Sequence, residues 1–335
     1  MTAQLISDLL GTLPQALQTY RFTAMPMNIF LTGGTGFIGS HVSMELLNRG
    51  HDITILARNP DKISAFRGMP KIKLVKGTLT DEAIIREHLQ GKDACIHIGL
   101  NYKEERMWKT ILDDTVPTVS MADAAVEAGV KHFIYTSSTS VNDNLYSPAN
   151  RDPSAKMVLT PEYPHTPASF YGATKAACED YLMAYSYQFP MQVNIIRPGY
   201  TFGNPVVAGA PTQADLRFVN LVKAARANEP IVLCKTDGTQ FIWAGDIAKV
   251  YADLLETDFT RKIYYALSQR FTTWAELAKI IIERIGSKSE IHLTEPETEG
   301  TLVWDVQAIK DDFGLAFDPW DALMEHLDYW IETCL

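Results

Sequence analysis

The chain has 335 residues, of which 46% are hydrophobic and 21% are charged, and its formal net charge is -10. This composition is ordinary for a globular protein with a large core, built as one elaborated domain or as two. The acidic balance argues against a basic nucleic-acid surface, so we expect no nucleic-acid partner.

The four cysteines lie far apart and form neither a paired nor a metal-ligand spacing. The chain also has no apolar run long enough to span a bilayer. We therefore expect no metal and no membrane contact, and a reducing, cytoplasmic location.

Residues 1–24 place leucine and isoleucine residues at helical spacing, which predicts one apolar stripe. Asp8 and Gly11 interrupt the run, whereas a signal peptide needs a basic start and an uninterrupted apolar stretch. We interpret the segment as a helical extension that docks on the body of the protein or on a second subunit. The alternative is that the start codon is assigned too far upstream and that the protein begins at Met25 or Met27.

From Met27 onward the sequence alternates between short apolar strands and amphipathic helices. The expected strands are 28–32, 51–57, 72–75, 94–99, 132–136 and 193–196, and the expected helices between them are 36–49, 82–89, 116–128 and 171–188. Alternation of this kind predicts an α/β fold, a Rossmann-type doubly wound parallel sheet with helices on both faces.

After Gly199 the alternation weakens and prolines and glycines become frequent. Helices are expected at 215–227, 244–255 and 273–285. This part predicts a smaller C-terminal substrate-binding lobe. The expected domains are the extension 1–24, an NAD(P)-binding Rossmann domain 25–202 to which 244–264 returns, and a lobe formed by 203–243 and 265–335.

The segment from Gly33 to Gly39 follows the first strand and opens the first helix, with glycines at 33, 34, 36 and 39. Such glycines allow a tight turn, a close approach of backbone N–H groups to a pyrophosphate, and close packing of helix on strand. Because the run lies between a strand and a helix, it predicts a dinucleotide site.

The end of the second strand indicates which dinucleotide binds. An acid there would hydrogen-bond a ribose 2′-OH and favour NAD, but Asp52 opens this strand and Arg58 follows its end. Arg58 could pair with a 2′-phosphate, so we favour NADP and keep NAD as the alternative.

Tyr171 and Lys175 are four residues apart on an expected helix, so both side chains lie on one face. A phenol has an ordinary pKa of about 10, and a neighbouring ammonium favours the phenolate. Ser138 ends the strand 132–136 with other hydroxyls, at the carboxyl edge where open parallel sheets bind ligands. The three side chains together predict proton transfer to or from a carbonyl or alcohol oxygen.

Two further polar residues are interpreted structurally. His97 lies within an apolar strand, where a hydrogen-bonded core histidine is the favoured interpretation over a functional one. Asp246 opens the helix expected at 244–255, where we predict an N-cap.

At this point the chain resembles the extended short-chain dehydrogenase/reductase superfamily, the NAD-dependent epimerase/dehydratase group, from about residue 28 to the C-terminus. The motifs that carry the resemblance are Gly33/Gly36/Gly39, Asp93-Ala94-Cys95-Ile96-His97, Tyr135-Thr136-Ser137-Ser138, Tyr171/Lys175, Arg197-Pro198-Gly199 and Gly245-Asp246-Ile247-Ala248. The resemblance implies Ser138, Tyr171 and Lys175 as the catalytic trio, and a homodimer formed through a helix bundle.

The candidate cofactor-binding residues follow the same regions of the chain. They are Gly33, Thr35, Gly36, Phe37, Ile38, Arg58, Thr78, Leu79, Ile98, Gly99, Thr136, Tyr171, Lys175 and Pro198. Lys175 is expected both to tune Tyr171 and to hold the nicotinamide ribose.

Departures from the family pattern narrow the expected activity. Sugar-nucleotide dehydratases carry Asp-Glu after the catalytic hydroxyl, where this chain has Thr139-Ser140. Sugar-nucleotide enzymes often carry Arg-Asp-Phe before the late aspartate, where this chain has Thr239-Gln240-Phe241, so an obvious clamp for a substrate pyrophosphate is missing.

We therefore expect an NADP(H)-dependent reductase or dehydrogenase acting on a small, non-nucleotide carbonyl or alcohol. An NAD-dependent nucleotide-sugar epimerase of the same family is the second interpretation. A non-catalytic NAD(P)-sensing regulator is the third, and the intact trio argues against it.

Overall fold

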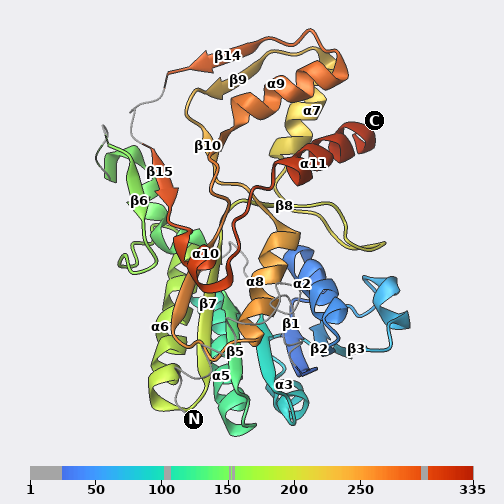
Figure 1. Cartoon of the computed structure of the whole chain (residues 1–335), viewed down its shortest axis with the longest axis vertical. Coiled ribbons are helices and arrows are strands. Elements are labelled where there is room, and N and C mark those ends of the chain that lie inside the picture. Colours follow the sequence, from blue (N-terminus) through green and yellow to red (C-terminus); the bar gives the residue numbers. More distant parts are fainter. Residues whose placement is uncertain (1–24, 102–106, 151, 153–154, 296–300, 335) are drawn as a thin grey trace, which may run out of the picture.

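The centre of the protein is a seven-stranded parallel sheet (Figure 1). The computed structural model describes residues 25–101, 107–150, 152, 155–295 and 301–334. The strand order is β3-β2-β1-β4-β5-β7-β12, and every neighbouring pair is parallel. The strands are β1 (Asn28–Thr32), β2 (Asp52–Ala57), β3 (Ile72–Lys76), β4 (Ala94–His97), β5 (His132–Thr136), β7 (Gln192–Pro198) and β12 (Lys262–Ala266).

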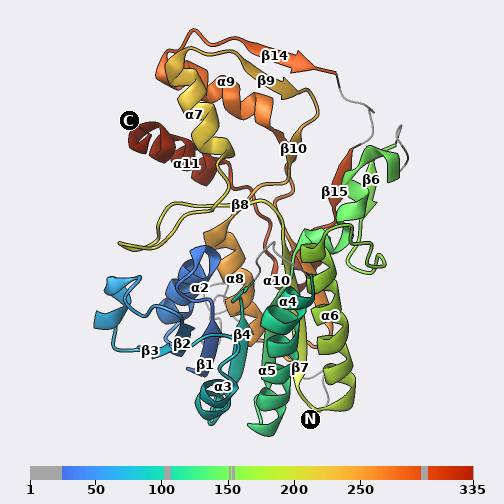
Figure 2. The same cartoon turned by 180° about the vertical axis from the view of Figure 1, so that it is seen from behind.

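Helices cover both faces of this sheet (Figures 1 and 2). One face carries α2 (Phe37–Asn48), α8 (Ala244–Leu255) and α10 (Gln307–Phe313). The other carries α3 (Glu82–Leu89), α5 (Val116–Glu127) and α6 (Phe170–Gln188). Successive side chains of β1 point to opposite faces of the sheet. Leu31 packs under α2 and α8, and Phe30 packs under α3 and α5. The predicted Rossmann-type doubly wound fold is confirmed.

A separate apolar cluster, apart from the two on the faces of the sheet, forms the lobe at the other end of the molecule (Figure 1). Its helices are α7 (Arg217–Ala227), α9 (Trp274–Ile285) and α11 (Trp320–Thr333), beside the strand pair β9 (Ile231–Cys234) and β14 (Ile291–Thr294). The buried Trp274 ring is central, with the rings of Phe218, Phe241 and Tyr200 at 5.0, 5.1 and 5.2 Å. A capping box, in which Thr273 and Glu276 bond each other's backbone N–H, starts α9.

Short strand pairs join the two parts. They are β8 (Thr201–Phe202) with β11 (Ile242–Trp243), β10 (Gly238–Thr239) with β13 (Thr272–Thr273), and β6 (Met157–Leu159) with β15 (Leu302–Trp304). The remaining elements are η1 (Ser64–Gly68), α4 (Met107–Thr110), the π-helical turn η2 (Ile111–Thr115), η3 (Thr139–Tyr146) and η4 (Pro148–Asn150). The strands of the three pairs β8–β11, β10–β13 and β6–β15 are only two or three residues long. They are too short for an alternation of apolar residues to reveal them in the sequence.

The edge strand β12 was not predicted from the sequence, and the N-cap role predicted for Asp246 is wrong. Helix α8 has Trp243 at its N-cap position, and Asp246 lies two residues inside the helix, 2.8 Å from Lys249 Nζ. Helix α10, from the last quarter of the chain, packs on α8 and β12 instead of on the lobe cluster. The domain boundaries and the role of residues 1–24 remain predictions, and the latter residues lie outside the described part of the chain.

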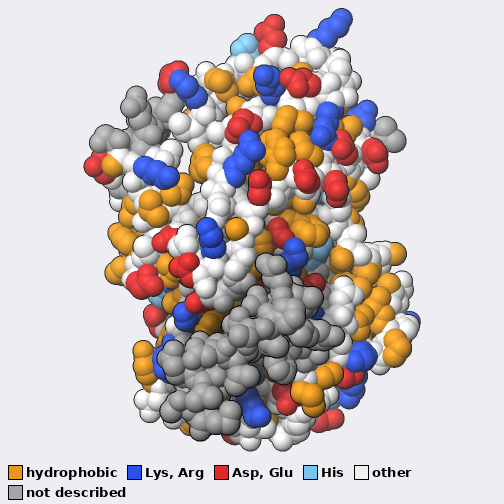
Figure 3. All heavy atoms as spheres, viewed as in Figure 1, with side chains coloured by type: hydrophobic (Ala, Val, Ile, Leu, Met, Phe, Trp, Pro, Cys, Tyr) orange, Lys and Arg blue, Asp and Glu red, His pale blue; other side chains and the backbone are white. Residues whose placement is uncertain are grey.

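The surface carries mixed charges. On the face shown in Figure 3, acidic and basic side chains are interspersed over both the sheet region and the lobe. None of the helices in the described ranges has the length and apolar character needed to cross a bilayer.

Three buried histidines hold the protein together in their neutral form. In β4, His97 lies between the hydroxyls of Thr32 and Thr118, at 2.6 and 2.9 Å, which confirms its interpretation as a hydrogen-bonded core residue. At the junction with the lobe, Asn204 joins His41 of α2, through its carbonyl at 3.1 Å, to His326 of α11, through its amide oxygen at 2.7 Å. Burial lowers the pKa of His41 to about 4, of His97 to about 3 and of His326 to about 4.

This burial predicts a steep loss of stability in acid. Since each folded-state pKa lies below that of the unfolded chain, the stabilisation is present above about pH 6.5 and is lost as the pH falls. At about pH 5 each histidine should cost about 2 kcal/mol of unfolding free energy. Denaturant unfolding at about pH 7.5 and about pH 5 should therefore show about 2 kcal/mol less loss for His326→Gln than for the wild type. Equal losses would contradict the assignment.

Candidate active site and cofactor cleft

The glycine turn between β1 and α2 has no room for side chains. Gly33 has a φ of +74°, and a Cβ there would lie 2.6 Å from the backbone nitrogen of Gly99. A Cβ on Gly39 would lie 2.0 Å from the Gly33 carbonyl oxygen. The turn therefore brings backbone within van der Waals contact of the end of β4, and it leaves the N-terminus of α2 open toward the carboxyl edge of the sheet.

Three adjoining cavities follow this edge of the sheet. The turn cavity, about 690 Å³, lies around the glycine turn, and the middle cavity, about 250 Å³, lies at the ends of β5 and β7. The lobe cavity, about 810 Å³, lies between this edge and the lobe. The middle cavity shares Phe37, Ile38, Ile98 and Leu100 with the turn cavity, and it shares Ser138, Tyr171, Gly199 and Gln213 with the lobe cavity. Together they form one elongated cleft with two wide ends.

All of the sequence-predicted site residues line this cleft. The turn cavity contains Gly33, Thr35, Gly36, Phe37, Ile38, Arg58, Thr78, Leu79, Ile98 and Gly99. The middle cavity contains Thr136, Ser138, Tyr171, Lys175 and Pro198, together with Phe37, Ile38 and Ile98. Residues at the ends of six strands and on two helices thus meet at one edge, as the parallel sheet requires.

The ammonium of Lys175 is fixed inside the protein. Its side chain is buried, its Nζ donates to the Thr136 carbonyl oxygen at 3.0 Å, and it lies 4.8 Å from the centre of the Tyr135 ring. Thr136 is itself held through its hydroxyl, 2.5 Å from the Tyr251 hydroxyl of α8. The cation is therefore attached to the end of β5, beside the hydroxyls that follow this strand.

Ser138 and Tyr171 lie where the middle and lobe cavities meet. The Ser138 Oγ accepts a hydrogen bond from the backbone N–H of Ser140 at 3.1 Å, which starts η3 and leaves the hydroxyl proton for another acceptor. Ser169 caps α6 by accepting from the backbone N–H of Gly172 at 2.9 Å. A Cβ on Gly172 would lie 2.1 Å from the Ser140 carbonyl oxygen, so α6 and η3 touch directly behind the two hydroxyls.

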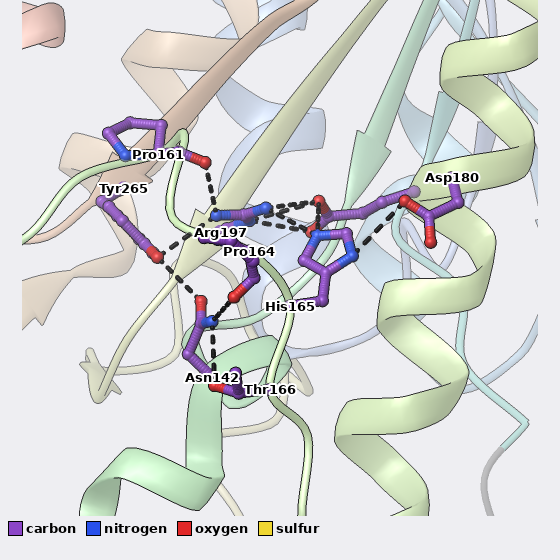
Figure 4. A network of polar contacts seen from close by, with 9 residues as sticks. Asn142, Pro161, Pro164, His165, Thr166, Asp180, Arg197 and Tyr265 are labelled. Atoms are coloured by element: carbon purple, nitrogen blue, oxygen red, sulfur yellow. Dashed lines mark hydrogen bonds and ion pairs between the residues drawn. The ribbon is translucent and has the colours of Figure 1, made fainter. Parts of the chain in front are cut away.

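A buried polar network supports the same region from behind (Figure 4). Arg197, at the end of β7, and Glu179, one helical turn beyond Lys175 on α6, are each 1% exposed. The guanidinium Nη2 lies 2.7 Å from Glu179 Oε2. Burial opposes the ionisation of Glu179, but hydrogen bonds from His165 and Arg197 outweigh burial and lower the pKa of this carboxyl below its ordinary value.

Several residues of the cleft were not singled out from the sequence. Asn59 and Lys62 join Arg58 in the turn cavity, and Gln213 joins the middle and lobe cavities. Arg217 and Asp237, 3.5 Å apart, lie in the lobe cavity. Lys62 lies in the turns between β2 and η1, and Gln213 lies in an irregular loop, so no local pattern of the sequence marks either residue. Within the described ranges, no group of three or more His, Cys, Asp or Glu side chains could hold a metal ion.

The sequence is similar to that of several characterised proteins. It is 26% identical over 292 residues to UDP-glucuronic acid decarboxylase 6 of Arabidopsis thaliana, which covers 84% of this chain and 81% of the relative. It is 27% identical over 184 residues to the 3 beta-hydroxysteroid dehydrogenase/Delta 5→4-isomerase of Mycobacterium tuberculosis, which covers 52% of this chain and 47% of the relative.

The fold is shared with solved structures. The Bordetella bronchiseptica enzyme WbmH, determined in complex with NAD+, superposes with a TM-score of 0.74 at 19% identity, over 93% of this chain and 100% of that one. The sequence model of the NAD dependent epimerase/dehydratase family matches residues 29–265, which include the glycine turn, Ser138, Tyr171 and Lys175. The chain belongs to this family, and it is an NAD(P)-dependent enzyme of the extended short-chain dehydrogenase/reductase type.

Proposed function

We propose that the protein is an NADP(H)-dependent reductase or dehydrogenase that moves hydride between the nicotinamide and a small, non-nucleotide carbonyl or alcohol. The observation that carries the proposal is the position of Ser138 and Tyr171 at the junction of two cavities. A cofactor that extends from the turn cavity into the middle cavity would end beside these hydroxyls. A substrate that enters the lobe cavity would reach them from the other side.

The residues of the turn fit a dinucleotide. Because Gly33 and Gly39 have no Cβ, the turn packs tightly on the protein's own backbone, and the backbone N–H groups at the start of α2 would be open to a pyrophosphate. When bound, the nicotinamide supplies or accepts the hydride. The ammonium of Lys175 carries three N–H groups, so it can serve Thr136 and the nicotinamide ribose together.

The proton is handled by the chain's own residues. Tyr171 would give its phenolic proton to the carbonyl oxygen in reduction and take it back in oxidation. The positive charge of Lys175, on the same helix face one turn away, would stabilise the negative charge that develops on the phenolic oxygen during this transfer. Ser138, whose Oγ already accepts from Ser140, would donate its hydroxyl proton to the same substrate oxygen.

The choice of NADP rests on the charges at the end of β2. Arg58 and Lys62 line the turn cavity together with Asn59, and the segment contributes no carboxylate to this lining. A 2′-phosphate carries at most two negative charges, and its oxygens accept hydrogen bonds. A guanidinium and an ammonium can pair with it. A ribose 2′-OH would instead need an acceptor at this place.

The choice of a non-nucleotide substrate rests on the lobe cavity. Thr239 lies in the cavity at the position where sugar-nucleotide enzymes often have arginine, and the neighbouring Gln240 is buried and bonded to the backbone of Ser268 and Trp304. Among the described residues that line this cavity, Arg217 is the one cation, and two carboxylates, Asp215 and Asp237, accompany it. A pyrophosphate would meet a net negative wall.

An NAD-dependent nucleotide-sugar epimerase is the second candidate. It is favoured by the match to a UDP-glucuronic acid decarboxylase over 84% of this chain, and by Arg217, which could bind a phosphate if Asp237 released it. Purification with bound NAD and saturable binding of a UDP-sugar would favour this candidate over our proposal.

We also propose a homodimer formed through helices. Trp108, Leu112 and Val116 follow one another at intervals of four residues along the continuous helix α4–η2–α5, and they are 60%, 51% and 50% exposed. Tyr181 of the neighbouring helix α6 is 55% exposed. An apolar stripe along one helix, together with an exposed apolar ring on the neighbouring helix, is the kind of surface that a second copy covers.

We further propose a reducing, cytoplasmic location. The four cysteines are all free thiols, and two of them, Cys95 and Cys178, are buried. Free thiols of this kind suit a reducing compartment.

Replacement of Tyr171 by Phe tests the reaction. We expect turnover of a carbonyl panel, followed by nicotinamide absorbance, to fall ~10²- to 10⁴-fold, because the general acid is removed. NADPH affinity, measured by fluorescence titration, should stay within about twofold, because the phenol does not hold the phosphates. Unchanged turnover would contradict the mechanism, and NADPH binding without turnover of any carbonyl or alcohol by the wild type would favour a sensing role.

Replacement of Arg58 by Ala tests the cofactor. We expect the Kd for NADPH to rise ~10- to 100-fold, since a charge-assisted contact to the 2′-phosphate is lost, while the Kd for NADH stays within about twofold. Lys73→Ala, which removes an exposed lysine of β3 outside the cavity, is the matched control and should leave both constants unchanged. A wild type that binds NADH more tightly than NADPH would refute the assignment.

Replacement of Leu112 by Glu tests the dimer. We expect analytical ultracentrifugation to show a dimer for the wild type and a monomer for this variant, because a charge on the apolar stripe is desolvated in the interface. Val232→Glu changes an equally prominent side chain, 65% exposed on β9 of the lobe, and should remain dimeric. A monomeric wild type would exclude the proposed interface.

A further inference from the structure

All five N–H groups of the buried Arg197 guanidinium have an acceptor within reach. Its Nε and one N–H of Nη2 meet the Glu179 carboxylate, at 2.9 and 2.7 Å. Its Nη1 lies 3.1 Å from the Pro161 carbonyl oxygen and 3.2 Å from the Tyr265 hydroxyl. The remaining N–H of Nη2 meets His165 Nε2 at 2.9 Å. A buried guanidinium N–H without an acceptor costs free energy, so the loss of any one of these partners is unfavourable. Arg197 therefore holds all of them in place together (Figure 4).

The network continues from Arg197 to the wall of the lobe cavity. Tyr265 donates its hydroxyl proton to Asn142 Oδ1 at 3.1 Å. The amide nitrogen of Asn142 then donates to the Pro164 carbonyl oxygen at 2.7 Å and to the Thr166 hydroxyl at 3.3 Å. Asn142 lies in η3, whose Thr139, Ser140 and Tyr146 line the lobe cavity. The guanidinium therefore positions the segment that follows Ser138.

His165 is the one member of this network with two competing partners at one atom. Its Nε2 lies 2.9 Å from a donor, Arg197 Nη2, and 3.1 Å from an acceptor, Glu179 Oε2. A ring nitrogen without a proton can accept from Arg197, and one with a proton can donate to Glu179, but it cannot do both. Its Nδ1 lies 3.4 Å from the exposed Asp180, to which it can donate both in the neutral ring that has its proton on Nδ1 and in the charged ring.

We propose that His165 is a positioning residue whose protonation state sets the shape of the substrate wall. With Nε2 unprotonated, it completes the set of acceptors around Arg197 and keeps residues 161–166 against η3. With Nε2 protonated, it turns its hydrogen bond to Glu179, and an N–H of Arg197 is left facing a second cation. This proposal rests on the proposed function, since it assigns a second titrating group to the same catalytic site.

Charged groups on two elements surround the His165 ring and bias its protonation. The groups that face the ring are Glu179 and Asp180 from α6 and Arg197 from β7. The hydrogen bond with Glu179 raises the pKa of His165 above its ordinary value, against the opposing effect of burial. A raised folded-state pKa stabilises the fold below about pH 6.5, and this stabilisation is lost as the pH rises through the raised pKa. Protonation of His165 therefore favours the fold while it disfavours the active arrangement.

Because protonation of His165 affects stability and activity in opposite directions, the pH dependence of kcat/KM distinguishes a positioning role from a structural one. In the wild type we expect kcat/KM for a carbonyl substrate to fall on the acid side of the His165 pKa, with an acid limb that is absent from His165→Gln, whose amide does not titrate. His165→Leu has no acceptor for Arg197. Its kcat/KM should lie about tenfold below the wild-type value measured on the alkaline side of the His165 pKa, and it should show no acid limb. Asp180→Asn should move the limb to lower pH, because it removes a negative charge near Nδ1.

Two readouts do not require turnover. NMR titration of the His165 ring in the full-length protein should give a lower pKa in Asp180→Asn than in the wild type. Amide hydrogen exchange of residues 161–168, corrected for the intrinsic pH dependence, should rise on the acid side of this pKa in the wild type and not in His165→Gln. His292→Gln, which removes an exposed histidine on β14, is the control and should match the wild type throughout.

The proposal is overturned if the acid limb persists in His165→Gln, if Asp180→Asn leaves it in place, or if exchange of residues 161–168 is independent of the protonation of His165. A parallel fall of Tm and kcat/KM in acid that is the same in His165→Gln would also overturn it, because it would reflect global stability alone. If no carbonyl or alcohol is turned over, the proposed function fails, and hydrogen exchange still decides the role of His165.

Discussion

The geometry of the cleft depends on two charges of opposite sign buried at the end of the sheet. Arg197 and Glu179 are each 1% exposed, so neither charge is tolerable without the other. Their contact fixes α6 against β7, and the bond from Lys175 to the Thr136 carbonyl oxygen fixes the same helix against β5. Because Tyr171, Lys175 and Glu179 follow one another at intervals of four residues, one helix face carries both the proposed catalytic groups and the carboxylate that supports them.

One irregular loop connects the turn cavity at one end of the cleft to the lobe at the other. The loop between β8 and α7 contacts α2 and α11 through Asn204, and a Cβ on its Gly209 would lie 3.3 Å from the Lys62 carbonyl oxygen. The loop then reaches the middle cavity at Gln213. A segment without regular structure thus contacts a residue that lines the turn cavity, lines the middle cavity itself and contacts helix α11 of the lobe.

How far the site was predictable depended on the range of the interactions. The glycine turn, Ser138, Tyr171 and Lys175 each lie at the boundary of a strand or helix that the local pattern reveals, and all of them line the cleft. Lys62, Gln213 and Asp237 come from loops, where no periodicity marks them. The helix cap assigned to Asp246 was wrong, because the chain enters α8 directly from β11 and the helix starts two residues before it. The small strand pairs and β12 depend on partners up to 145 residues away, as in β6 and β15.

Local sequence by itself determined the alternation of strands and helices, the doubly wound parallel sheet, and the chemical types gathered at its carboxyl edge. These follow from side-chain periodicity and from the handed connection of parallel strands, which are properties of short segments. Only the tertiary structure decided that Glu179 of α6, His165 of a loop, Arg197 of β7 and Tyr265 of β12 share one hydrogen-bonded network. Burial makes that network obligatory, and burial is set by how distant segments pack and not by any spacing within them.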